Sequence, residues 1–229
     1  MKIVLFDIDG TLLHSGGAGK NAMMQTFEEL FRIKNGFAGI SMAGKTDPLI
    51  IKTAFENHSI NPTADIVDQF KKRYFELLAE NIKLNYAKKK IYPGVSDLLD
   101  ALAEHPEIIM GLLTGNWQEG ARIKLSYFNF DRYFSFGAFG SDSIDRNELL
   151  PIALKRCEID NRNGWKNRDV VVIGDTPNDV QCAKVHNALA LAVATGTYSV
   201  DDLYRSGADL ALDDLSDVES IKNWILKKK

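Results

Sequence analysis

The sequence has little of several residue types and patterns that would indicate a particular class of protein. Its 229 residues include two cysteines, Cys157 and Cys182, too few for a disulfide framework and without the spacing of a zinc site. Its four histidines contain no i, i+4 pair, which argues against a histidine-bound zinc ion. The first apolar run ends after four residues, far short of the roughly 20 needed for a membrane span. With a net charge of -3 and no dense stripe of lysine and arginine, we expect a cytoplasmic protein with no membrane or nucleic-acid partner.

The order of the patterns that are present predicts an α/β fold with an inserted helical unit. Three glycines fall within residues 16–19, and three segments with helical periodicity follow without a strand between them. From residue 92 onward, apolar runs alternate with amphipathic segments, the pattern of a doubly wound parallel sheet. We predict a core domain over residues 1–14 and 92–229 and a small helical cap domain over residues 15–91. The expected later strands are 108–113, 134–139, 169–174, 189–193 and 209–212, and the expected later helices are 95–103, 117–128, 148–157, 179–186 and 218–226.

Two carboxylates follow the first strand directly. The apolar run 3–6 shows no alternation, as in a central strand buried on both faces, and it leads into Asp7 and Asp9. Residues two apart on a strand point to the same face, and α/β proteins bind ligands at the carboxyl ends of their strands. Carboxylates this close repel each other unless a cation or a shared proton holds them, and a divalent metal is the simplest explanation. The same residues also fit an ordinary turn.

Two later strand ends add groups suited to phosphate and metal. The strand expected over 108–113 is followed by a hydroxyl and backbone N–H groups near a helix start, which suit phosphate oxygens and also fit a helix cap. A second buried strand, ending at residue 173, is followed by a second acid pair, which also fits a helix cap. An arginine that precedes a helix between these strands offers a cation. These candidates are Thr114, Gly115, Asn116, Asp175, Asp179 and Arg146.

Together these motifs resemble the haloacid dehalogenase superfamily of aspartate-dependent phosphohydrolases, over the whole chain and in the right order. Residues 7–12 match the first motif of that family, residues 113–115 the second and residues 174–179 the fourth. The third motif usually carries a lysine at the start of a helix, where this sequence has Arg146, with Lys155 as the alternative. An arginine keeps the positive charge and can bind phosphate oxygens through two donors. The inserted helices resemble the small cap of phosphoglycolate phosphatases and β-phosphoglucomutases.

The resemblance implies a Mg²⁺-dependent phosphatase that acts through an aspartyl phosphate. Asp7 would be the nucleophile, and Asp9 would protonate the leaving group and then deprotonate the attacking water. The Asp7 carboxylate, the Asp9 backbone carbonyl and Asp175 would hold Mg²⁺, while Asp179 would act on Asp175 or on a water ligand. Thr114, Gly115 and Asn116 would donate hydrogen bonds to phosphate oxygens. Arg146 would balance negative charge on the nucleophile and on the transferred group.

The cap is expected to set substrate choice because it would enclose the site. Lys45, in the loop 42–48 between cap helices, is a candidate for binding the substrate, although a solvated loop lysine fits equally well. Enclosure favours a small phosphorylated metabolite, such as phosphoglycolate or a sugar phosphate. We expect a monomer or a homodimer.

Other activities use related groups and stay open as alternatives. A halide leaving group needs no proton, so Asp9 favours a phosphatase over a dehalogenase. A phosphonatase would need a Schiff-base lysine from the cap, for which Lys20 and Lys45 are candidates. A phosphomutase of the β-phosphoglucomutase type would need its aspartyl phosphate shielded from water. A receiver-like domain or a non-hydrolytic phospho-binding protein would keep the acids without turnover.

Overall fold

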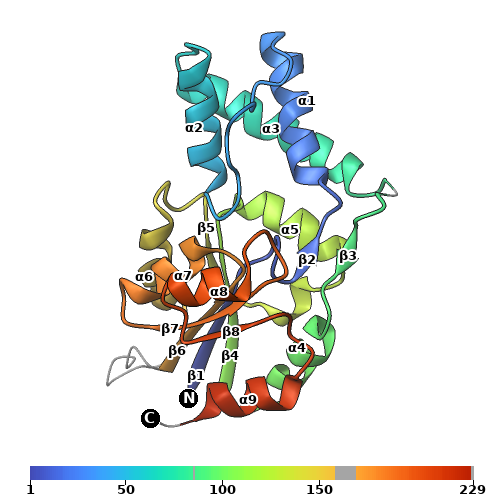
Figure 1. The fold of residues 1–229 in the computed structure, drawn as a ribbon. Helices are drawn as coiled ribbons and strands as arrows, with labels where there is room; N and C mark the ends of the chain where they lie inside the picture. Colours follow the sequence, from blue (N-terminus) through green and yellow to red (C-terminus); the bar gives the residue numbers. More distant parts are fainter. Residues whose placement is uncertain (85, 158–168, 228–229) are drawn as a thin grey trace.

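Six parallel strands form the central sheet (Figure 1). The computed structural model describes residues 1–84, 86–157 and 169–227. The sheet order is β5-β4-β1-β6-β7-β8, so the chain builds outward from β1 through β4 and β5 and then crosses back to build β6, β7 and β8. This arrangement confirms the predicted doubly wound α/β fold. The strands of the sheet are β1 (Lys2–Phe6), β4 (Ile108–Thr114), β5 (Gly137–Phe139), β6 (Val170–Gly174), β7 (Leu189–Val193) and β8 (Leu210–Leu212).

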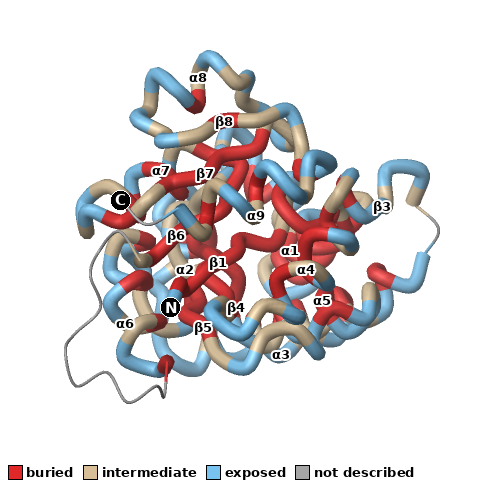
Figure 2. The backbone as a smooth tube through the Cα atoms, turned by 90° about the horizontal axis from the view of Figure 1, so that it is seen from below, coloured by how far each residue is buried: buried red, intermediate tan, exposed pale blue. Residues whose placement is uncertain are grey.

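Helices cover both faces of the sheet, which explains why its central strands are apolar without alternation. Val4 and Phe6 of β1 pack with α4, α5 and α9 on one face, whereas Ile3 and Leu5 pack with α6, α7 and α8 on the other. Figure 2 shows the resulting buried centre, with β1, β4 and β6 surrounded by partly exposed helices. These helices are α4 (Val95–Ala103), α5 (Gln118–Tyr127), α6 (Leu149–Arg156), α7 (Pro177–Lys184), α8 (Val200–Arg205) and α9 (Val218–Leu226), with 3-10 turns η1 (Asp131–Tyr133) and η2 (Arg146–Glu148).

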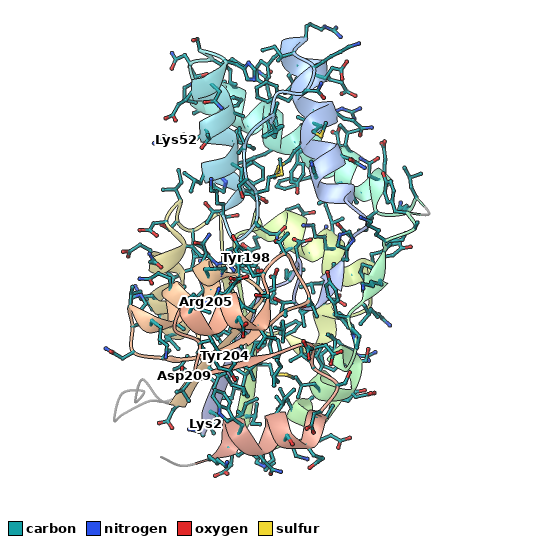
Figure 3. All side chains as sticks on the ribbon, in the orientation of Figure 1. Lys2, Lys52, Tyr198, Tyr204, Arg205 and Asp209 are labelled. Atoms are coloured by element: carbon teal, nitrogen blue, oxygen red, sulfur yellow. The ribbon has the colours of Figure 1, made fainter. Side chains whose placement is uncertain are left out.

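Three helices lie together beyond one end of the sheet: α1 (Ala18–Phe31), α2 (Asp47–Asn57) and α3 (Ala64–Asn81) (Figure 1). They form a hydrophobic cluster with Trp117 at the start of α5, and within it the Phe27 ring lies 4.9 to 6.4 Å from four other phenylalanine rings. In Figure 3, Lys52 projects outward from α2, whereas Lys2 marks the opposite end of the molecule at the start of β1. Most residues of this cluster come from the inserted segment, which supports the proposed division into a core domain and an inserted cap domain.

A short antiparallel ribbon joins the two parts. It pairs β2 (Leu13–His14) with β3 (Lys90–Ile91), and these strands lie at the points where the chain leaves the core and returns to it. The sequence patterns did not predict this ribbon, because two residues per strand are too few to show any periodicity.

Strand β5, at one edge of the sheet, is shorter than predicted. The apolar run 134–139 suggested a strand over all six residues, but β5 covers only Gly137–Phe139. The preceding turn η1 takes up the start of the run, since the Phe134 N–H bonds back to the Asp131 carbonyl oxygen at 3.3 Å. Phe134 then packs against the core as a side chain outside the sheet. The described part of the chain contains no helix with the length and apolar character of a membrane span.

Candidate active site

The three central strands bring their polar ends to one edge of the sheet. Asp7 follows β1, Thr114 ends β4 and Asp175 follows β6, and β1 lies between the other two strands. A cavity of about 860 Å³ opens over this edge. Of the residues predicted for the site, Thr114 and Asp179 are buried beside the cavity. The others line it, namely Asp7, Asp9, Lys45, Gly115, Asn116, Arg146 and Asp175.

Three buried carboxylates form a compact group at the edge of the sheet. Oxygens of Asp7, Asp175 and Asp179 all lie within 4.8 Å of one another. Burial raises the pKa of Asp7 to about 6, and Asp179 adds to the rise, while Arg146 opposes it. Burial also raises the pKa of Asp175 well above its ordinary value, again with help from Asp179. The three carboxylates offer hard oxygen donors, and together they carry more negative charge than the one neighbouring guanidinium can balance. Both properties suit Mg²⁺, so the residues fit the implied metal.

Arg146 provides the positive charge of this group. Its Nη2 lies 3.2 Å from Asp7 Oδ1 and also donates to Asp179 Oδ1. Burial alone would lower the pKa of Arg146, but Asp179 and Asp7 raise it above the ordinary value. Its Nε is buried without a hydrogen-bond partner among the described residues. Lys155, the alternative cation, lies on α6 and lines a different cavity, so the structure places Arg146 beside Asp7.

Asp179 caps a helix, as its position in the sequence allowed, and also contacts Arg146. Its Oδ2 accepts the Thr176 N–H at 3.0 Å in a capping box that starts α7, and its Oδ1 holds Arg146. Both oxygens therefore have protein donors. Asp175 has one such donor among the described residues, the Thr11 hydroxyl at 3.3 Å. The oxygens of Asp179 are thus taken up by Thr176 and Arg146, and its predicted action on Asp175 or on a water ligand stays a prediction.

The Asp9 side chain faces a lysine that the sequence reasoning missed. Its Oδ2 accepts hydrogen bonds from Lys124 Nζ at 2.5 Å and from Asn116 Nδ2 at 2.9 Å. Among the described residues it is therefore outside the group of three carboxylates, and its predicted metal contact through the backbone carbonyl stays a prediction. A signal for Lys124 was present, because it falls on the same helix face as the buried Gly120 and Ala121. Lysine is rarely buried unless it is paired.

The helix-cap interpretation of Thr114, Gly115 and Asn116 is wrong. Helix α5 begins after Trp117, and no side chain of its own segment caps it. Instead, Asp47 of the cap domain accepts the Trp117 N–H through Oδ2 at 2.8 Å, and Ser141 accepts the Gln118 N–H at 2.9 Å. A residue of the cap domain thus completes the start of a core helix.

The loop before α2 is fixed to the core around Asp47. The Asp47 N–H donates to the Gly115 carbonyl oxygen at 2.8 Å, and the Thr46 hydroxyl donates to the Ile144 carbonyl oxygen at 2.7 Å. A Cβ atom at Gly115 would lie 2.3 Å from the Lys45 carbonyl oxygen, so glycine is required for this close approach. The loop carries Lys45 to the wall of the cavity, and its role in binding the substrate stays a prediction.

Stability should depend on pH through Asp47. Burial raises its pKa to about 7, although Lys124 opposes the rise. The ordinary value is about 4, so the folded state binds more protons, and the free energy of unfolding falls as pH rises from 4 to 7. Asp47→Asn keeps an acceptor for Trp117 and removes this contribution, on the order of 4 kcal/mol at most. The free energy of unfolding should be measured by urea unfolding in EDTA at pH 5 and at pH 8. It should fall less between these two pH values for Asp47→Asn than for the wild type, and an equal fall in both proteins would contradict the assignment.

The family described as "Haloacid dehalogenase-like hydrolase" matches residues 4–193. The chain belongs to this family. The resemblance predicted from the motifs is thereby confirmed, and the chain is a hydrolase by family.

Individual relatives agree with the family match. A phosphoglycolate phosphatase of Rhodospirillum rubrum is 27% identical over 226 residues, which cover 98% of this chain and 90% of the relative. A hydrolase structure from Pseudomonas syringae has a TM-score of 0.72 at 20% identity, covering 99% of this chain and 100% of its own. A Thermotoga maritima structure provisionally named β-phosphoglucomutase has a TM-score of 0.65 at 22% identity, and the match covers 99% of this chain and 100% of that structure's chain. At these identities the two structures show a shared fold.

Proposed function

We propose that this hydrolase is a Mg²⁺-dependent phosphatase of small phosphorylated metabolites, with phosphoglycolate or a sugar phosphate as substrate and an aspartyl phosphate on Asp7 as intermediate. The observation that carries the proposal is the contact of Arg146 with Asp7 in a group of buried acids on a cavity wall. The named phosphoglycolate phosphatase relative supports the substrate class.

The metal would be held by Asp7 and Asp175, with the Asp9 carbonyl as a further predicted ligand. When bound, Mg²⁺ would offset negative charge on the nucleophile and on the phosphate and hold them together. Arg146 supports phosphate binding in its own right, because its buried Nε lacks a partner among the described residues and can donate to a phosphate oxygen.

The side chains of this protein divide the reaction between them. The Asp7 carboxylate attacks phosphorus, the bond from phosphorus to the ester oxygen breaks, and that oxygen takes a proton from the Asp9 carboxylic acid. Water then attacks the phosphorus of the aspartyl phosphate and gives a proton to Asp9. The bond between phosphorus and the Asp7 oxygen breaks, so phosphate is released, Asp7 is again a carboxylate and Asp9 is again a carboxylic acid. The Thr114 hydroxyl favours the ionised form of Asp7, since it lowers the pKa of that carboxyl, and it would orient the attacking carboxylate.

The cavity also favours a substrate with a second negative group. Besides the groups assigned to phosphate and Lys124, which pairs with Asp9, four lysines line it. Such a lining suits the carboxylate of phosphoglycolate or a second phosphate on a sugar. The four lysines are Lys20, Lys45, Lys88 and Lys90.

Removal of divalent metal tests the proposal. Phosphate release from a panel of phosphorylated metabolites should be measured with Mg²⁺ and with EDTA. Activity should fall at least about 100-fold in EDTA and return when Mg²⁺ is restored. Equal activity in both buffers would contradict the metal assignment. Isomerised sugar phosphate without phosphate release would identify a phosphomutase instead. The predictions of a cytoplasmic location and of a monomer or homodimer stay predictions.

A further inference from the structure

Lys124 is a buried cation that none of the sequence motifs contains. It lies on α5, and its side chain is only 5% exposed. Burying an ammonium group is costly unless charged and hydrogen-bonding partners compensate for the lost water. A lysine at this position therefore depends on the groups that surround it.

The partners of Lys124 connect it to three predicted site residues. Its Nζ donates to Asp9 Oδ2 at 2.5 Å and to Asn116 Oδ1 at 2.7 Å. Asn116 Nδ2 in turn donates to Asp9 Oδ2 at 2.9 Å and to Thr114 Oγ1 at 2.8 Å. An ammonium group has donors and no acceptor, so it turns the oxygen of Asn116 toward itself and the amide nitrogen toward Asp9 and Thr114.

This network determines how Thr114 and Asp7 interact. Because Thr114 Oγ1 accepts the hydrogen bond from Asn116, the hydrogen of its hydroxyl is left for the Asp7 carboxylate, whose pKa Thr114 lowers. Lys124 therefore acts on both acids of the first motif, directly on Asp9 and through Asn116 and Thr114 on Asp7.

The two oxygens of Asp9 are in different situations. Oδ2 accepts from two donors, whereas Oδ1 has no hydrogen-bond partner among the described residues. The side chain is 42% exposed and lines the cavity. Without donors on Oδ2, such an exposed carboxylate would rotate freely and present either oxygen, or neither, to a bound ester.

The cap domain covers Lys124. A Cβ atom at Gly19, on α1, would lie 3.3 Å from Nζ and 3.6 Å from the Tyr74 hydroxyl. Packing this close leaves little room for Nζ to move toward α1. It keeps the ammonium group on the side of Asp9 and Asn116.

We propose that Lys124 is a positioning residue, which holds Asp9 Oδ2 so that Oδ1 exchanges the proton with the ester oxygen and then with water. The proposal rests on the proposed function. It predicts that Lys124 matters most where proton transfer to the leaving group matters most, namely for alkyl phosphates. A p-nitrophenolate ion leaves without a proton, so its departure needs no acid.

The test compares kcat/KM for phosphoglycolate and for p-nitrophenyl phosphate, with Mg²⁺, because kcat/KM reports the steps up to phosphoryl transfer. Lys124→Met should lower kcat/KM about 100-fold for phosphoglycolate and about 3-fold or less for p-nitrophenyl phosphate. A burst of p-nitrophenolate should also appear, because water attack on the aspartyl phosphate still needs Asp9. Lys124→Arg should recover at least 10-fold of the loss for phosphoglycolate.

Controls separate positioning from general damage. Lys155→Met, which changes a lysine at a different cavity, should leave both values within about 2-fold of wild type. If Lys124→Met does not fold, Lys124→Gln provides the same comparison with a neutral donor. Equal losses for the two substrates would overturn the role of Lys124. A wild-type protein that hydrolyses no phosphate ester would overturn the proposed function, and this proposal with it.

Discussion

Replacing Asp7 with Asn should lower kcat by at least about 10⁴-fold while the protein stays folded, because the amide cannot form the aspartyl phosphate. Asn is nearly isosteric and removes one charge from a group of three carboxylates, in which burial raises the pKa values of Asp7 and Asp175. We therefore expect the metal-free variant to be at least as stable as the wild type. Phosphate release from p-nitrophenyl phosphate and urea unfolding measure the two effects.

Asp9→Asn is the matched comparison, since it changes the other acid of the first motif in the same way. This variant should still transfer the phosphoryl group from p-nitrophenyl phosphate to Asp7 and then fail to release it. Rapid mixing should show a burst of about one equivalent of p-nitrophenolate for Asp9→Asn and no burst for Asp7→Asn. Bursts of equal size in both variants would mean that Asp7 is not the nucleophile.

Arg146→Leu should lower the free energy of unfolding in EDTA by about 3 to 5 kcal/mol, because it leaves buried carboxylates without their guanidinium. Arg146 contacts both Asp7 and Asp179, and all three side chains are at most 8% exposed. Mg²⁺ should restore part of the loss by supplying positive charge to the same group. Turnover of the best substrate should fall about 100- to 1,000-fold, and Arg146→Lys should recover part of it.

Arg156→Leu provides the control for this prediction. Arg156 also pairs with a carboxylate, that of Asp142, but its side chain is 43% exposed. An exposed pair contributes about 1 kcal/mol or less, and Mg²⁺ should not change the result. Equal losses in the two variants would show that the Arg146 contacts contribute no more than a surface ion pair.

The acids of the site were predictable because strand order alone brings them together. An apolar run followed by Asp is visible in the sequence at both Asp7 and Asp175, and parallel strands align their carboxyl ends. The position of Arg146 before a helix was visible in the same way. Its contact with Asp7, in preference to Lys155, depends on how α6 packs on the sheet, which no local pattern reports.

The groups that the sequence reasoning missed act across large separations in the chain. Asp47 was predicted only as part of the loop 42–48, and the folded structure alone shows it accepting the N–H of Trp117, 70 residues later. Lys124 looked like one of many helix lysines, although its place on the apolar face of α5 was a signal that could have been used. Contacts of this kind depend on how distant segments of the chain pack against each other. Hydrophobic periodicity indicates local helices and strands and does not report that packing.

The contact between Asp47 and the start of α5 limits how freely the two parts of the chain can be recombined. A protein engineer who transplants a cap from a relative to change substrate range would also remove the acceptor for the Trp117 N–H and expose Trp117, which is 2% exposed in the intact chain. A chimera should therefore need an acid or amide at the position of Asp47, and a glycine at 115, before its new cap can seat. In this molecule, a change of cap that alters substrate range would therefore also alter the packing of the core at the start of α5.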